Sequence, residues 1–183
     1  MSQRVAKFTE TTFDDVVYSY LNEYPDTTEL YIDNIFLRKP AHPRRKIENL
    51  KLKVLKVDTY ASYEDYCLVY QLLEWNAEYL QGIYMGMYTP RISMIFSSDY
   101  YWKNLYEIRC DDKTIPIWWT PLQWNSFPRL INYNVHPEMK NSVLDHIIIG
   151  NQKKFKAVIA IYLSLKYLKI IKDIRLLICN FVW

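Results

Sequence analysis

Glycine, cysteine and histidine are scarce in this chain, and each scarcity excludes a class of site. Only three glycines occur among 183 residues, at positions 82, 86 and 150, where average usage would give about 13. A glycine-rich phosphate loop cannot be built from them, so we exclude the common nucleotide-binding fingerprints. The three cysteines and three histidines form no paired metal-binding spacing, so we expect no metal site and no cofactor. With no recognisable catalytic constellation, we predict that the protein is not an enzyme.

Long apolar runs are also missing. The longest uncharged run near the C-terminus extends from Ala157 to Leu165, well short of the roughly 20 apolar residues that a membrane-spanning helix needs. The first residues show no signal-peptide pattern, and an odd number of widely spaced cysteines is typical of a reducing compartment. We therefore expect a cytoplasmic protein that has no membrane partner.

Basic and acidic residues are nearly balanced in number, with one locally basic segment. Lys and Arg number 23 against 20 Asp and Glu, a net charge of +3, which is too small to indicate a nucleic-acid field over the whole surface. The segment 38–46 concentrates basic side chains and two prolines, which predicts an extended cationic loop that could contact phosphates. Its basic residues are Arg38, Lys39, Arg44, Arg45 and Lys46. The alternative is a solvated loop beside a lysine-edged strand.

Apolar patterning indicates alternating helices and strands up to Pro137. We expect a helix from Phe13 that ends before Pro25, and a second helix over 62–81, where a strand pair is the alternative. We expect strands over 30–37, 49–60, 82–96 with a turn at Thr89-Pro90, 100–110 and 114–119. No internal repeat is evident. These patterns predict an α+β protein with a mostly antiparallel sheet and one or two packed helices.

The sequence pattern changes after Pro137, and from there the apolar spacing is typical of helices. Helices are expected over 141–150, 153–169 and 172–183, with Gly150 ending the first of them. We therefore divide the chain into an α+β domain over residues 1–137 and a C-terminal helical subdomain over residues 138–183, packed on it or extending from it.

The last of these helices is apolar on two opposed faces. At about 100° per residue, one face is a core stripe formed by Ile170, Ile174, Leu177, Ile178 and Phe181. The other face carries Leu176, Cys179 and Trp183, which we take as candidates for binding a protein partner, since a helix with two apolar faces is either sandwiched in its own domain or docked on another molecule.

A run of tryptophans offers a second candidate surface. Trp118, Trp119 and Trp124 lie close together around Pro121. Large aromatic side chains are enriched at protein interfaces. The alternative is that they close the core of a glycine-poor domain.

Two resemblances bear on function. The segment Ile171-Lys172-Asp173-Ile174-Arg175-Leu176-Leu177-Ile178-Cys179-Asn180-Phe181 resembles the F-box-like or SOCS-box-like C-terminal ends of proteins from large cytoplasmic DNA viruses, which implies a ubiquitin-ligase adaptor. The length and the Tyr-, Ile- and Lys-rich, Gly-poor composition resemble the small early proteins of African swine fever virus, which implies a viral protein in the host cytoplasm. We expect a non-enzymatic interaction module that binds a host or viral protein through the C-terminal helices and the tryptophan-rich segment. The alternative is a nucleic-acid-binding accessory protein that uses the loop 38–46.

Overall fold

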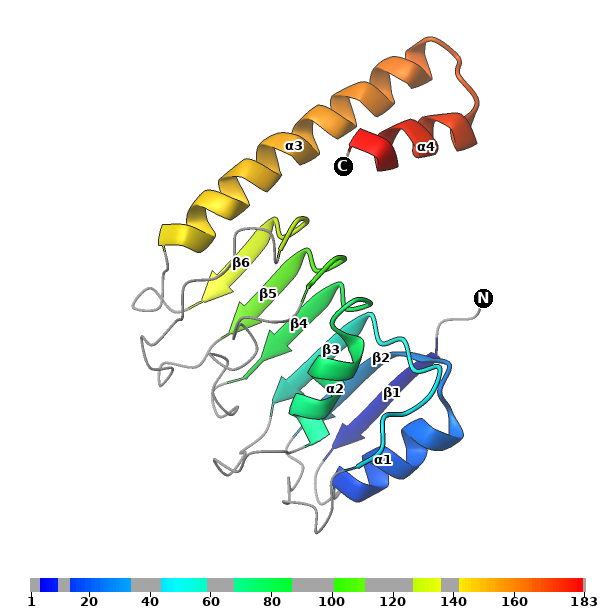
Figure 1. Ribbon diagram of the computed structural model, residues 1–183, viewed down its shortest axis with the longest axis vertical. Coiled ribbons are helices and arrows are strands. Elements are labelled where there is room, and N and C mark those ends of the chain that lie inside the picture. The colour runs from blue at the N-terminus through cyan, green and yellow to red at the C-terminus, as the bar shows by residue number, and fades with distance from the viewer. Residues whose placement is uncertain are drawn as a thin grey trace.

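The fold is a single parallel sheet with helices on one face and a helical hairpin at one end (Figure 1). The computed structural model describes residues 4–9, 14–33, 44–58, 68–86, 101–110, 127–135 and 142–182. The strands are β1 (Arg4–Thr9), β2 (Thr27–Asp33), β3 (Val54–Asp58), β4 (Gly82–Met85), β5 (Glu107–Cys110) and β6 (Asn132–Val135). The helices are α1 (Asp14–Glu23), α2 (Leu68–Asn76), α3 (Ser142–Tyr167) and α4 (Lys172–Val182).

The six strands lie in the order in which they occur in the chain. Each strand pairs in parallel with the next, from β1 to β6. Parallel neighbours need a long crossover connection, whereas antiparallel neighbours can be joined by two residues. The chain therefore winds as a series of coils, each of which is one strand with the connection that leads to it. The result is a solenoid in the α/β class.

A repeated apolar motif builds these coils. Four successive coils share a six-residue motif that begins at Leu52, Leu80, Leu105 and Leu130. The motif is Leu-x-x-Φ-x-Φ, where the first Φ is apolar or aromatic and the second is apolar. The first interval is 28 residues and the next two are 25. The backbone repeats as well, because Leu105 N donates to Trp102 O at 3.3 Å and Leu130 N donates to Phe127 O at 3.5 Å. The coils of β5 and β6 thus enter their strands through the same four-residue turn.

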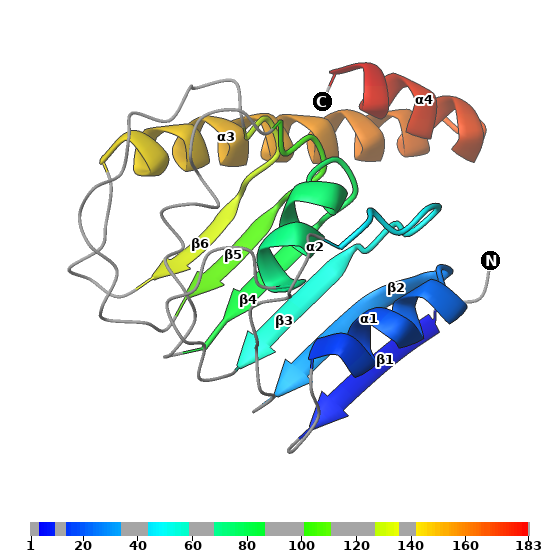
Figure 2. The same ribbon diagram turned by 60° about the horizontal axis from the view of Figure 1, so that its bottom comes forward.

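The core lies between the inner face of the sheet and the helices. The inward strand positions of β2 to β5 are buried, and they are Leu30, Ile32, Leu55, Val57, Ile83, Met85 and Ile108. Helices α1 and α2 lie on the same side of the sheet (Figure 2) and bury Val17, Leu21 and Leu72 against it. Trp102 and Phe127, at equivalent positions of adjacent coils, stack with ring centroids 6.3 Å apart.

Helix α3 closes the C-terminal end of the solenoid. In the preceding coils the residue after the motif leucine donates its backbone N–H to the coil before it, as Ile131 N does to Tyr106 O at 3.0 Å. The carbonyl of Ile131 instead accepts a 2.9 Å hydrogen bond from Gln152 Nε2 of α3. Beside it, Asn151 Nδ2 donates to Phe127 O and Leu130 O, both at 2.9 Å. Side-chain amides therefore take the place of a further coil, as a capping element must.

Beyond Asn151, α3 extends past the sheet, and α4 folds back along α3 (Figure 1). The hydrogen bonds from Ile170 N to Leu165 O and from Lys169 N to Lys166 O end α3, with Lys169 in the left-handed region at φ 59°. This is the Schellman arrangement. Arg175 of α4 lies 4.9 Å from the ring centroid of Tyr162, and Cys179 Sγ donates to Val158 O at 3.7 Å.

Several sequence-based expectations need correction. The predicted mostly antiparallel α+β sheet is wrong, because each paired strand is parallel to its neighbour, and the coil repeat went unnoticed because its leucines recur at unequal intervals. Gly150 does not end a helix, since α3 continues through it. The first helix is confirmed as α1. The expected strand over 114–119 and the turn at Thr89-Pro90 lie outside the described residues.

Candidate interaction surfaces

The outer face of the sheet carries a row of cationic and aromatic side chains. Strand register places one residue of each strand beside its neighbour, from β1 to β5, and the row is Lys7, Tyr31, Lys56, Tyr84 and Arg109. Lys56 and Arg109 are exposed, and the two tyrosines are half-buried. Because these positions alternate with the buried ones along each strand, the core of the sheet holds this row in place.

Tyr84, Glu107 and Arg109 form a hydrogen-bonded cluster at the β4–β5 end of this row. The Tyr84 hydroxyl donates to Glu107 Oε2 at 2.5 Å, and Arg109 Nε and Nη2 lie 3.0 and 2.9 Å from Glu107 Oε1. Burial raises the pKa of the Tyr84 hydroxyl, and the hydrogen bond to the Glu107 carboxylate raises this pKa further. The hydroxyl therefore stays protonated and holds Glu107 at neutral pH. The cluster presents a fixed aromatic ring beside a guanidinium group.

A second, smaller cluster occupies the β1–β2 end of the row. The Tyr31 hydroxyl donates to Glu29 Oε2 at 3.1 Å, and Lys7 Nζ lies 5.4 Å from the centroid of the Tyr31 ring. Burial first, and then the hydrogen bond to Glu29, raise the pKa of Tyr31. The glutamates of both clusters thus accept from tyrosines of the same face, which leaves Lys56 between two ordered tyrosines.

A depression of about 190 Å³ opens on this face beside Tyr84. It is lined by Lys56, Asp58, Tyr84, Met85, Gly86 and Arg109. Gly86 allows the Asp58 side chain to approach, because a Cβ at position 86 would collide with the Asp58 carboxylate. The depression therefore offers ammonium and guanidinium donors on either side of an aromatic ring, with a carboxylate at its rim.

The predicted C-terminal candidates have different environments. Cys179 is buried, at 8% exposure, against α3, whereas Leu176 is 44% exposed. Ile174 and Leu177, which we had assigned to a core stripe, are 48% and 70% exposed. The face of α4 that packs on α3 is thus the one through Arg175 and Cys179, which contact Tyr162 and Val158. Trp183 lies outside the described residues.

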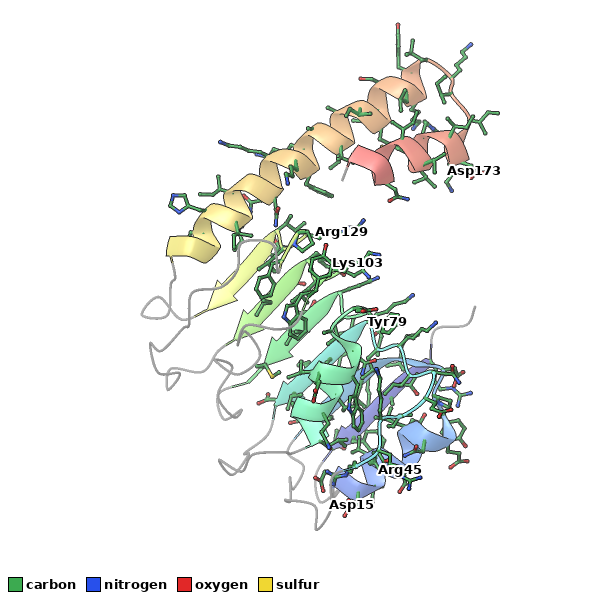
Figure 3. All side chains as sticks on the ribbon, in the orientation of Figure 1. Asp15, Arg45, Tyr79, Lys103, Arg129 and Asp173 are labelled. Atoms are coloured by element: carbon green, nitrogen blue, oxygen red, sulfur yellow. The ribbon has the colours of Figure 1, made fainter. Side chains whose placement is uncertain are left out.

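The predicted basic loop is only partly represented. Arg44 does not face solvent, because its side chain is 5% exposed and its Nη2 lies 2.9 Å from Asp14 and 2.7 Å from Asp15 at the start of α1. Arg45 and Lys46 are exposed, and Figure 3 shows Arg45 near Asp15. Arg38 and Lys39, like Trp118, Trp119 and Trp124, fall outside the residues that the structure describes.

Comparison with known proteins identifies no family. No protein-family model matches the chain, and neither a curated protein nor a solved structure matches it. Among the described residues, no group of three His, Cys, Asp or Glu side chains could hold a metal ion. A search of the same residues finds no helix with the length and apolar character to cross a membrane.

Sequence reasoning missed the outer-face row altogether. Its members are separated by 24, 25, 28 and 25 residues from Lys7 to Arg109. Aligning the chain on the motif leucines would have placed Lys56, Tyr84 and Arg109 in one column, four residues after Leu52, Leu80 and Leu105. That alignment was the available signal.

Proposed function

We propose that this protein is a non-enzymatic interaction module that binds a protein partner on the outer face of its parallel sheet. The observation that carries the proposal is the aligned row of Lys56, Tyr84 and Arg109 around a depression. Tyrosine and arginine, with tryptophan, are the side chains enriched at the energetic centres of protein interfaces. Their prior ordering by Glu107 lowers the entropy that binding must remove.

The architecture supports the same proposal. Solenoids whose repeats have about 20 to 29 residues in a Leu-x-x-Leu-x-Leu order line one continuous surface with their strands. Stacked repeats in general create extended binding surfaces. This support is an analogy at the level of the fold.

The chemistry of the face indicates which groups a partner would present. Lys56 and Arg109 flank the Tyr84 ring, so a carboxylate of the partner would receive donors from both sides. Asp33 and Asp58 lie at adjacent register positions on β2 and β3, where they would accept from a basic side chain. The partner segment would therefore carry an acidic and a basic residue close together.

Two earlier expectations stay as predictions beside this proposal. A ubiquitin-ligase adaptor role for the last helix, with a viral origin, rests on the sequence resemblance alone. Nucleic-acid binding by the loop 38–46 loses one of its five cations to the buried ion pair of Arg44 with Asp14.

The proposal can be tested by affinity capture with a charge-altered variant. Immobilised wild-type protein and the double variant Lys56→Glu, Arg109→Gln would be exposed to the same cell lysate, and captured proteins would be quantified by mass spectrometry. Gln at position 109 retains a donor for Glu107. We expect the amount of each captured protein to be at least about tenfold lower with the variant than with the wild type. A loss of about 1.4 kcal/mol in binding free energy weakens binding tenfold.

The matched control is Arg45→Glu, Lys46→Gln, which makes the same change of net charge on exposed residues away from the sheet face. It should capture the same proteins as the wild type. Equal capture by wild type and the sheet-face variant would contradict the proposal. Loss of capture with the control, together with sensitivity to nuclease, would instead favour the nucleic-acid alternative.

A further inference from the structure

The outer half of the α3–α4 hairpin exposes an unusual amount of apolar surface. Most of the large exposed apolar side chains in the described chain lie on these two helices and the turn between them. At the turn, Tyr167 is 88% exposed, Leu168 66% and Ile171 68%. Soluble monomers rarely leave contiguous apolar patches of this kind uncovered, so the hairpin marks a binding region.

These apolar side chains point in more than one direction. On α3, Phe155, Ile159 and Leu163 recur every four residues and form one stripe. On α4, the adjacent residues Leu176 and Leu177 are both exposed, although neighbours in a helix point about 100° apart. A groove on another protein covers one face of a helix pair. A lipid interface can surround all sides of a projecting end.

The same segment concentrates positive charge. Residues 152–183 carry seven Lys or Arg and one Asp, a net charge of +6. Because the whole chain carries +3, the other 151 residues carry −3. The body would thus be repelled by an anionic surface, while the hairpin would be attracted to it.

The basic residues also surround the apolar end. Lys166, Lys169 and Lys172 interleave with Tyr167, Leu168 and Ile171, and all six are exposed. Figure 3 shows Asp173, beside this turn, far from the strands, so the body does not shield the end of the hairpin. Apolar and aromatic side chains among lysines are the composition of segments that lie in the interface of anionic membranes.

We propose that the end of the α3–α4 hairpin inserts its apolar side chains into the interface of an anionic lipid bilayer, with the surrounding lysines on the lipid headgroups. This revises the sequence-based expectation of no membrane partner. It is independent of the sheet face, which lies on other elements and would remain free to bind a protein.

The test is co-sedimentation of the full-length protein with vesicles of phosphatidylcholine, with and without phosphatidylserine. We expect binding to the mixed vesicles that weakens as salt is raised, and little binding to phosphatidylcholine alone. The variant Leu168→Ser, Ile171→Ser should bind the mixed vesicles at least about tenfold more weakly, because it removes two apolar side chains from the inserted end. The variant Lys166→Gln, Lys172→Gln should bind the mixed vesicles about fivefold more weakly for each lysine replaced.

The matched control is Val16→Ser, Tyr101→Ser, which removes two exposed apolar side chains from the body. It should bind vesicles as the wild type does. Thermal unfolding followed by circular dichroism should be similar for all variants, since every altered side chain is exposed. Absence of vesicle binding, or binding unchanged by Leu168→Ser, Ile171→Ser, would overturn the proposal. Protein capture that needs Leu168 and Ile171 without any vesicle binding would assign the hairpin to a protein groove and also overturn it.

Discussion

Side-chain amides form hydrogen bonds that join one coil to the next. Leu52 N donates to Asn76 Oδ1 at 2.9 Å, and Asn104 Nδ2 donates to Glu78 O at 2.6 Å. Figure 3 shows Tyr79, Lys103 and Arg129 along these turns, where Arg129 Nη1 reaches Asn104 Oδ1 at 3.3 Å. The buried amide of Leu52 needs such a partner, because leaving one unpaired costs about 1–3 kcal/mol.

Asn151 is the residue on which the C-terminal cap depends most. Replacing it with Leu keeps a side chain of similar size but removes the donor to Phe127 O and Leu130 O. We expect the free energy of unfolding to fall by about 1–3 kcal/mol in urea titration. Gln152→Leu, whose side chain is exposed, should cost no more than about 1 kcal/mol. Equal costs for the two variants would argue against the burial and double hydrogen bonding of Asn151.

At the scale of elements, α3 shows tertiary contacts overriding a local signal. Glycine commonly ends a helix, and the sequence alone therefore predicted a stop at Gly150. In the structure, Ile147, Ile148 and Asn151 on both sides of Gly150 are buried against the last coil. That packing holds both segments in one helix of 26 residues.

Gly150 consequently offers a stabilising substitution. Its side-chain position is open, with no heavy atom within 4 Å of an added Cβ. Gly150→Ala should raise the free energy of unfolding by about 0.5–1 kcal/mol, because alanine loses less backbone entropy in a helix interior. Gly86→Ala is the control and should destabilise, since its Cβ would collide with Asp58. A Gly150→Ala variant less stable than wild type in the same denaturant titration would indicate that the helix breaks there.

Individual elements could be predicted from the sequence better than their arrangement. The helix before Pro25 is confirmed, because its apolar spacing and first-turn acids Asp14 and Asp15 act locally. The lysine alternation around β3 also marks a strand, although the strand begins only at Val54. Its direction in the sheet depends on contacts with β2 and β4, and these are not local.

At the scale of the whole molecule, the parallel order follows from a repeat of imperfect spacing. Tyr133 of β6 stands where Leu30, Leu55, Ile83 and Ile108 stand in β2 to β5, so a search for identical residues at one period fails. The outer-face row depends on the same alignment, and for this reason a residue such as Tyr84 can be selected from the sequence only after the repeat has been aligned. The candidates chosen on α4 came from a helix wheel, which shows faces but not which of them packs.

The molecule thus separates two surfaces by position and charge. The sheet face lies on the body, and the apolar, basic hairpin projects from its capped end (Figure 1). One contact surface does not cover the other, so a protein partner and a lipid surface could be engaged together. Each surface can then be altered without changing the other.

The most direct measurement of the central claim is site-specific photo-crosslinking from the two sides of the sheet. A benzophenone amino acid would be placed at Asp33, exposed on the outer face, and separately at Val16, exposed on α1 over the inner face. We predict discrete protein adducts from position 33 that disappear with Lys56→Glu, Arg109→Gln, and none from position 16. Adducts from position 16 alone, or adducts from position 33 that persist in the charge-altered variant, would contradict the assignment of the sheet face as the binding surface.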